Sequence, residues 1–418
     1  EIRTPLNGII GFSNLLLSSD LTEIQKQHLE TVNQSASTLL DVVNDILDIS
    51  KIEAGKLIID KEKTSLHSII NQCIDMMKFM AHQKNLELIV NIHKDVHCAI
   101  WVDEMRLKQI LQNLLNNAVK FTQKGQIELE VSSTNINDNS SKIKFSVKDT
   151  GIGIKKGNKK KILEAFTQED NSTTRNYGGT GLGLTITNSL LKLMNSKLEI
   201  DSEPNVGSTF SFELDLKSEF CNNHINTNKH NFKKALIIED NQQVASIIKN
   251  ILQNFTIEAD IYENSFENIA SFVSENNYNL LLLDLEYLSE TTTIKIINEL
   301  NNLPNLSVIV MQNSNSKFNE TGNNKNVQSI IKPLKHEALQ NFLNQNYSET
   351  KQPTKNAKED ISLHSPSILI VDDNKINMLL TKTLIRNKVP SSIIYEAKNG
   401  QEAVDLALEN KPDIIFMD

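Results

Sequence analysis

The chain has 418 residues, of which 39% are hydrophobic and 23% are charged, a composition typical of about two to four globular domains. Its formal net charge of −9 argues against a nucleic-acid-binding surface, and its three scattered cysteines support neither a disulfide framework nor a zinc site. No apolar run reaches the roughly 20 residues that a membrane helix needs. Because the sequence begins without Met, we expect it to be part of a longer protein.

Two long amphipathic segments open the chain. The first runs from Glu1 to about Ser18 and the second from Thr22 to about Glu53, with a short polar turn between them. Apolar residues recur at three- and four-residue steps in both, which predicts an antiparallel helical hairpin. One hairpin cannot bury two broad apolar stripes, so we expect two copies to pair as a four-helix bundle. Docking of the hairpin on its own downstream domain is the alternative.

Residues 55–217 combine strand and helix patterns that predict an α+β sandwich, because most strands are grouped apart from the helices. The strand-like runs are Leu57–Ile59, Leu86–Ile92, Ile127–Val131, Ile143–Val147, Leu198–Ile200 and Thr209–Leu214. The helical runs are Leu66–Met80, Met105–Phe121 and Thr185–Met194.

The helix Met105–Phe121 carries polar residues suited to a nucleotide. Asn113 and Asn117 are four residues apart and therefore share one helix face. An amide oxygen is a suitable ligand for Mg²⁺, and Lys120 could meet a phosphate as a point charge. Considered alone, an amphipathic helix with solvated asparagines is an equally good interpretation.

Two Gly-rich loops follow this helix. In the first, Asp149 ends a strand and can accept a hydrogen bond from an exocyclic amine, while Gly151 and Gly153 let the backbone approach a flat base. An ordinary acid at a strand end is the alternative for Asp149. In the second, glycines up to Gly183 precede a helix, whose N-terminal N–H groups favour an anion.

A polar linker, residues 218–232, separates this region from a different pattern in residues 233–347. Continuous apolar strands alternate there with amphipathic helices, which predicts a buried parallel sheet. The expected strands are Ala235–Ile238, Leu280–Leu283, Val308–Val310 and Ile330–Ile331. Acids that follow such strands, Glu239, Asp240 and Asp284, are expected to converge at one sheet edge.

After a second linker, residues 348–366, the same pattern begins again in residues 367–418. Ile368–Val371 leads to Asp372 and Asp373, and Ile414–Met417 leads to Asp418. This internal repeat is a strong signal. The second copy has roughly half of the length of such a domain, so we expect its last strand to expose an apolar edge.

Together these motifs resemble those of hybrid sensor histidine kinases. The helix with Asn113 resembles the N box and the two loops the G1 and G2 boxes; Ile162–Phe166 and Asp170–Arg175 resemble the F box and lid, and Glu1–Asn7 the H box. The resemblance implies a dimerisation hairpin in residues 1–54, a Bergerat-type ATP-binding sandwich in residues 55–217, and flavodoxin-like receiver domains in residues 233–347 and 367–418. We call the last two receiver 1 and receiver 2.

The implied activity is ATP-dependent phosphorylation of a histidine, followed by transfer to a receiver aspartate, with ATP and Mg²⁺ as cofactors. Asn117 would hold Mg²⁺, Asp149 would read adenine, and the lid and glycines would cover the phosphates. The implied catalytic residues are Glu1, Thr4, Asn113 and Lys120. The implied nucleotide-binding residues are Asn117, Asp149, Gly151, Gly153, Thr174, Gly179, Gly181, Leu182 and Gly183.

The histidine that the family phosphorylates would stand immediately before Glu1. We therefore expect no autophosphorylation of this sequence at the usual site. Glu1 matches a general base and Thr4 a residue of phosphatase activity, although first-turn helix chemistry explains both equally well.

In the receivers, the resemblance implies a metal site at Glu239 and Asp240, and another at Asp372 and Asp373, with Asp284 and Asp418 as phospho-acceptors. Lys332 matches the family's lysine. Gln312 stands at the position of the usual hydroxyl. Receiver 1 is therefore either phosphorylated at Asp284 or a pseudo-receiver with a docking role. In receiver 2, the hydroxyl and lysine would lie beyond Asp418.

Two rival functions remain. A gyrase-like or MutL-like ATPase is disfavoured by the hairpin and the receivers, and a scaffold whose receivers only bind partners stays open. The implied partners are a second copy of the chain and a downstream response regulator or phosphotransfer protein, with no nucleic acid. We expect a cytoplasmic location for this part of the chain, with any inner-membrane anchor outside it.

Overall fold

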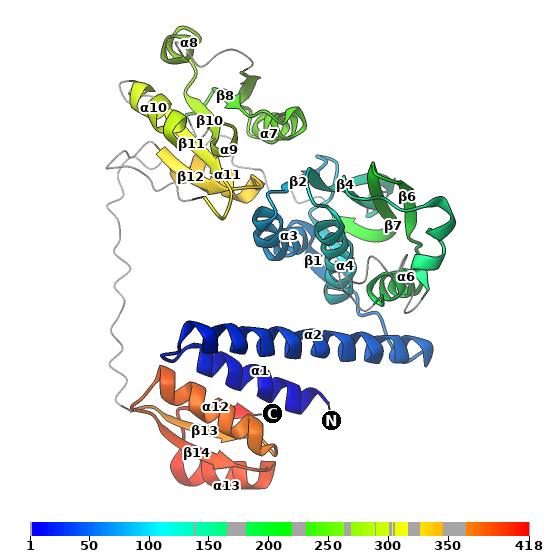
Figure 1. The fold of residues 1–418 in the computed structure, drawn as a ribbon, viewed down its shortest axis with the longest axis vertical. Coiled ribbons are helices and arrows are strands. Elements are labelled where there is room, and N and C mark those ends of the chain that lie inside the picture. Colours follow the sequence, from blue (N-terminus) through cyan, green and yellow to red (C-terminus); the bar gives the residue numbers. More distant parts are fainter. Residues whose placement is uncertain are drawn as a thin grey trace. The chain divides into compact units, whose positions relative to one another are not determined.

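A computed structural model describes residues 2–137, 139–164, 181–219, 231–262, 269–288, 290–300, 303, 306–316, 327–345 and 365–417. The chain forms two compact units (Figure 1). One unit combines Glu1–Lys56 with Gln352–Asp418, and the other is Leu57–Lys351. Each unit is described by itself.

The first unit begins with the expected helical hairpin. Helices α1 (Arg3–Leu17) and α2 (Glu23–Glu53) are antiparallel, and the Arg3 Nε atom donates to Asn44 Oδ1 at 2.8 Å. Thr22 starts α2 through a capping box with Gln25, which satisfies two backbone N–H groups at the helix end. The turn residues of the sequence therefore determine where the second helix begins.

Receiver 2 forms a parallel three-stranded sheet with the order β14-β13-β15. Its elements are β13 (Ser367–Val371), α12 (Lys375–Lys388), β14 (Ile393–Ala397), α13 (Gly400–Asn410) and β15 (Ile414–Met417). The apolar side chains of β15 are between 45% and 65% exposed. The predicted exposed apolar edge at this strand is therefore confirmed.

The second unit begins with the ATPase sandwich. Its seven-stranded sheet has the order β1-β3-β7-β5-β4-β2, with β6 paired to β7. The strands are β1 (Glu62–Ser65), β2 (Glu87–Ile92), β3 (Ala99–Val102), β4 (Gln126–Asn137), β5 (Ser140–Asp149), β6 (Glu199–Glu203) and β7 (Gly207–Glu219). The helices that bury their apolar residues are α3 (Leu66–Gln83), α4 (Glu104–Phe121) and α6 (Gly183–Leu193). The α+β class is confirmed.

Several expectations for this sandwich were wrong in detail. Leu57–Ile59 is not a strand, and Ile58 is 86% exposed. The first strand is instead Glu62–Ser65, whose polar residues carry no alternating pattern and which pairs with the short β3 that we missed. Strand β7 continues to Glu219 because its end pairs with Ala99, so the linker begins later than residue 218.

The cysteines also differ from expectation. Cys73 on α3 is a buried free thiol. Cys98 is disulfide-bonded, although the spacing of the cysteines supported no disulfide framework.

Receiver 1 is a parallel five-stranded sheet with the order β12-β11-β10-β8-β9, the flavodoxin-like arrangement. Its strands are β8 (Lys234–Ile238), β9 (Glu258–Ile261), β10 (Leu280–Asp284), β11 (Ser307–Gln312) and β12 (Val327–Ile331). Its helices are α7 (Gln242–Asn254), α8 (Ile269–Glu275), α9 (Leu285–Leu288), α10 (Glu290–Leu300) and α11 (His336–Gln345). The predicted strands are present, and β9 is an addition.

Candidate functional site

Helix α4 is the centre of the candidate ATP site. Asp103 caps it by accepting a hydrogen bond from the Arg106 backbone N–H at 3.0 Å. The apolar side of the helix is buried, which leaves Asn113, Asn117 and Lys120 partly exposed on the other side. The predicted amphipathic helix is confirmed, and its polar face is accessible to a ligand.

Asn113 connects α4 to α6. Its Nδ2 atom donates to the Gly183 carbonyl at 3.2 Å and lies 3.4 Å from the Thr187 hydroxyl. The first turn of α6 therefore lies against the polar face of α4. Just before this helix, Leu182 is fully buried and Gly181 has a φ of 72°, a conformation that favours glycine.

Asp149 lies at the end of β5, beside the other end of α4. Its carboxyl is buried, and its Oδ1 atom accepts a hydrogen bond from the Gly151 N–H at 2.8 Å. Burial raises the pKa of Asp149, although hydrogen bonds from the backbone of Gly151 and Ser208 act in the opposite direction. A buried acid at the end of a strand is suited to accept a hydrogen bond from a base amine.

The loop after Asp149 approaches two other segments too closely for a side chain. A Cβ atom at Gly151 would lie 2.5 Å from the Phe121 carbonyl oxygen at the end of α4. At Gly153, where φ is 66°, it would lie 2.0 Å from the Glu203 carbonyl oxygen. The two glycines of the predicted loop are therefore needed to pack it between α4 and β6.

Sequence reasoning missed the residues that support Asp149 from the other side. At Gly207, where φ is 135°, a Cβ atom would lie 2.0 Å from the Asp149 carbonyl oxygen. Ser202 Oγ accepts from the Ile154 N–H at 2.8 Å and donates to the Gly207 carbonyl at 2.9 Å. The only signal in the sequence was the glycine itself, because cross-strand pairing decides this contact.

Lys120 lies at the last turn of α4. Its Nζ atom is 4.8 Å from the centre of the Phe121 ring, and partial burial lowers its pKa. Glu1, Thr174 and Gly179 lie outside the described residues. Thr4 is on the first turn of α1, in the other compact unit.

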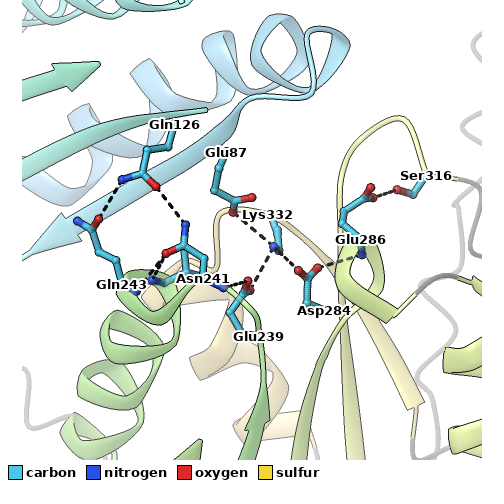
Figure 2. Close-up of polar contacts among 10 residues, drawn as sticks. Glu87, Gln126, Glu239, Asn241, Gln243, Asp284, Glu286, Ser316 and Lys332 are labelled. Atoms are coloured by element: carbon cyan, nitrogen blue, oxygen red, sulfur yellow. Dashed lines mark hydrogen bonds and ion pairs between the residues drawn. The ribbon is translucent and has the colours of Figure 1, made fainter. Parts of the chain in front are cut away.

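The acids of receiver 1 converge at the carboxyl edge of its sheet, as Figure 2 shows. Oxygen atoms of Glu239, Asp240 and Asp284 all lie within 4.8 Å of one another. Lys332 Nζ lies 3.0 Å from Asp284 Oδ2 and 3.2 Å from Glu239 Oε2, and all three side chains are almost fully buried. A fourth group, Glu87 from β2, has its Oε1 atom 3.4 Å from the same ammonium.

The charges at this site are unbalanced, since one ammonium faces three carboxyl groups. Burial raises the pKa of Glu239 to about 8, against the opposing effect of Lys332. Burial disfavours the charge of Lys332, but Glu87, Glu239 and Asp284 together outweigh it and raise its pKa. Glu239 Oε2 accepts no well-formed hydrogen bond among the described residues, and neither does the buried oxygen of Gln312.

This arrangement fits a divalent cation. A buried carboxylate oxygen without a hydrogen bond, next to two further acids, is the donor set that Mg²⁺ prefers. In receiver 2, the Oδ1 atom of the half-buried Asp372 accepts from the Asn374 N–H at 2.8 Å, and Asp373 is exposed. Asp418 lies outside the described residues, so the structure does not place the second acceptor.

Two family models match the chain. Residues 1–55 match the His Kinase A phospho-acceptor domain, and residues 102–218 match the histidine kinase-, DNA gyrase B- and HSP90-like ATPase domain. Together with the ATP-site geometry, these matches show that the chain contains the phospho-acceptor and ATPase domains of histidine kinases.

Its relatives are of the hybrid sensor type. It is 33% identical to the signal transduction histidine-protein kinase BarA of Escherichia coli K12, over all of this chain and 45% of that protein. It is also 33% identical to the sensor protein GacS of Pseudomonas syringae pv. syringae, over all of this chain and 47% of GacS. It is 42% identical to the hybrid signal transduction histidine kinase L of Dictyostelium discoideum. That match covers 52% of this chain and 13% of the relative. The chain thus spans less than half the length of these curated relatives.

The fold is similar to that of a solved structure. A crystal structure of full-length ShkA in complex with AMPPNP matches with a TM-score of 0.61 and 24% identity, over 99% of this chain and 83% of that one. No helix among the described residues is long and apolar enough to cross a membrane.

Proposed function

We propose that this chain binds ATP with residues 55–219 and acts in a two-component phosphorelay, in which the γ-phosphoryl group passes to a histidine and then to a receiver aspartate. The observation that supports this most directly is the packing of both Gly-rich loops against α4, at Gly151–Phe121 and at Asn113–Gly183. The AMPPNP in the similar structure supports ATP as the nucleotide.

In this proposal each residue has a physical role. Asp149 accepts a hydrogen bond from the adenine amine, and Gly151 and Gly153 let the base approach. Asn117 supplies an amide oxygen to Mg²⁺, and Lys120 supplies a positive charge near the phosphates. We assign Asn113 a positioning role instead of the direct catalytic role expected from the sequence, because its amide already holds the start of α6.

The remaining sequence assignments stay proposals. Glu1 and Thr4 would act on the phospho-accepting histidine, and Thr174 and Gly179 would cover the phosphates. Mg²⁺ would be held in receiver 1 by Glu239, Asp240 and Asp284, and in receiver 2 by Asp372, Asp373 and Asp418. The cation would offset charge on a phosphoryl group that moves to the aspartate.

The implied partners are a second copy of the chain and a phosphotransfer protein or response regulator. The α1–α2 hairpin supports pairing with a second copy. On α2, three apolar residues at a spacing of seven form a stripe that is 43–50% exposed: Val32, Leu39 and Ile46. We propose a cytoplasmic location for this part of the chain.

Calorimetry with Mg²⁺–ATP on the 418-residue chain tests the ATP site. We expect Asp149→Asn to abolish detectable binding, because the amide presents a donor where the base amine needs an acceptor. Asp201→Asn is the control, since Asp201 is a nearby acid whose side chain is 99% exposed. Binding by Asp149→Asn as tight as that of the unmodified chain would contradict the adenine assignment.

A further inference from the structure

The acidic edge of receiver 1 is in contact with the ATPase domain of the same compact unit (Figure 2). Five polar pairs connect the segments after β8, β11 and β12 to α3 and to the first residues of β2 and β4. They are Lys332–Glu87 at 3.4 Å, Asn241–Gln126 at 3.2 Å, Gln243–Gln126 at 3.0 Å, Ser314–His82 at 2.9 Å and Lys335–Asp75 at 2.8 Å. We call the receiver side of these pairs the docking face.

The ATPase side of this contact is a sheet edge. Strand β2 is the last strand of its sheet, so one side of its backbone is unpaired there. Such edges need protection from unspecific pairing. In this chain the apolar side chains of Val244 and Ile248 on α7 line a shared recess with Leu88 and Val90 of β2. Apolar side chains of both domains therefore lie beside the polar pairs of the docking face.

Glu87 occupies the most demanding position of this contact. Burial raises the pKa of its carboxyl group, Lys332 opposes that effect, and the nearby Asp284 adds to it. A buried carboxylate without a counter-charge costs folding free energy. The Lys332 ammonium that compensates Glu87 also lies within 3.2 Å of Asp284 and Glu239. The Lys332 ammonium, 3.4 Å away, therefore offsets the cost of a charged Glu87 at this position.

The docking face lies at the same carboxyl edge of the receiver sheet as Glu239 and Asp284. Asn241 and Gln243 follow β8, Ser314 follows β11, and Lys332 and Lys335 follow β12. An anion held on Asp284 would need Lys332 as its counter-charge, and it would add negative charge beside Glu87. Binding of an anion on Asp284 and docking of Glu87 therefore both require the Lys332 ammonium group.

We infer that the acidic edge of receiver 1 is a docking surface whose partner is the β2 edge of this chain's own ATPase domain, and that Glu87 competes with an anion on Asp284 for Lys332. With the site empty, the two domains are held together. With an anion on Asp284, Glu87 is repelled and the contact opens. Of the two roles left open for receiver 1, this inference supports docking, and it does not depend on phosphoryl transfer from a histidine.

Hydrogen exchange of the 418-residue chain, followed by mass spectrometry, tests the contact. Asp75 and Lys335 form an ion pair whose side chains are partly exposed. Their charges can therefore be reversed without placing a new charge in the buried core. We expect Asp75→Lys and Lys335→Asp each to speed exchange several-fold in β2 and at the start of α7, and the double reversal to restore protection. Equal exchange in all four chains would overturn the docking.

The competition is tested on the same peptides with two probes. Mg²⁺ alone is expected to leave them protected, and Mg²⁺ with beryllofluoride, an aspartyl-phosphate mimic, is expected to speed their exchange. Glu87→Gln removes the repelled charge and should keep the contact closed with either probe. Glu219→Gln, in an exposed ion pair with Lys63 that is not part of the docking contact, should respond like the unmodified chain. No response to beryllofluoride, or an equal response in Glu87→Gln, would overturn the competition.

Discussion

The side-chain amide of Asn113 donates a hydrogen bond to the Gly183 carbonyl, 3.2 Å away, and so joins two segments that are 70 residues apart in the sequence. The same amide lies 3.4 Å from the Thr187 hydroxyl, one turn further along α6. The side of α4 opposite its buried residues is thus the surface on which the second Gly-rich loop ends. A change at Asn113 is expected to act on the nucleotide through the position of this loop.

Asn113→Asp tests that role. The new carboxylate would face the Gly183 carbonyl oxygen without a donor between them, and an unmade buried hydrogen bond costs about 1–3 kcal/mol. We expect weaker Mg²⁺–ATP binding by calorimetry and faster hydrogen exchange in Gly183–Leu193. Asn116→Asp is the matched control, because Asn116 is exposed on the same helix. Unchanged exchange in α6 together with weak ATP binding would point to direct nucleotide contact instead.

Gly207 allows a second prediction, in a residue that is not expected to touch the nucleotide. An alanine there would place Cβ 2.0 Å from the Asp149 carbonyl oxygen at a φ of 135°. We expect Gly207→Ala to destabilise the fold by about 1–3 kcal/mol and to weaken ATP binding, because Asp149 must move. Thermal unfolding and calorimetry measure the two effects.

The control for Gly207 is Gly157→Ala, since a Cβ atom at Gly157 meets nothing within 4 Å. It should leave both the unfolding temperature and ATP binding unchanged. Full ATP affinity in Gly207→Ala would show that the position of Asp149 does not depend on the β6–β7 turn.

The fold was largely predictable because its signals are local. The helices around Asn113 and Thr22 show regular apolar spacing and capping residues, and the receiver strands are continuous apolar runs. The strand Glu62–Ser65 was missed because an edge strand exposed on both faces needs no apolar alternation. Its place is decided by pairing with β3, which is a long-range contact that spacing cannot show.

The site was predictable in its main residues but not in its support. Asp149 and its glycines could be found because a strand, an acid and a Gly-x-Gly follow one another in the sequence. Glu87 could not, because nothing in Leu86–Ile92 distinguishes an ordinary strand acid from one that meets Lys332, 245 residues away. Charges that meet between domains leave no periodic pattern.

The exposed stripe on α2 predicts self-association through the hairpin. Leu39 is the central residue of the three, and Leu39→Glu would require a second hairpin to bury an unpaired charge. We expect the unmodified chain to be a dimer by light scattering and Leu39→Glu to be a monomer at the same concentration. Gln34→Glu, an exposed position on the other side of α2, is the control. A monomeric unmodified chain would rule out the stripe as a dimer contact.

The raised pKa of Glu239 predicts that Mg²⁺ binding to receiver 1 releases a proton. Its folded pKa of about 8 lies above the value of roughly 4.3 for an unfolded chain, so at pH 7 the folded state holds a proton that the unfolded state lacks. The stability that comes from this proton is fully present below about pH 4 and is lost as the pH rises through about 8. A metal ligand must be deprotonated, so Mg²⁺ has to displace the proton, and its affinity should rise with pH until about 8.

Calorimetry at pH 7 in two buffers of different ionisation enthalpy measures the release, which we expect to approach one proton. Glu239→Gln should remove the release and should also make the chain more stable than the unmodified one above pH 8. Glu258→Gln, an exposed acid on β9, should change neither quantity. Mg²⁺ binding with no proton release in the unmodified chain would show that Glu239 is already ionised beside Lys332.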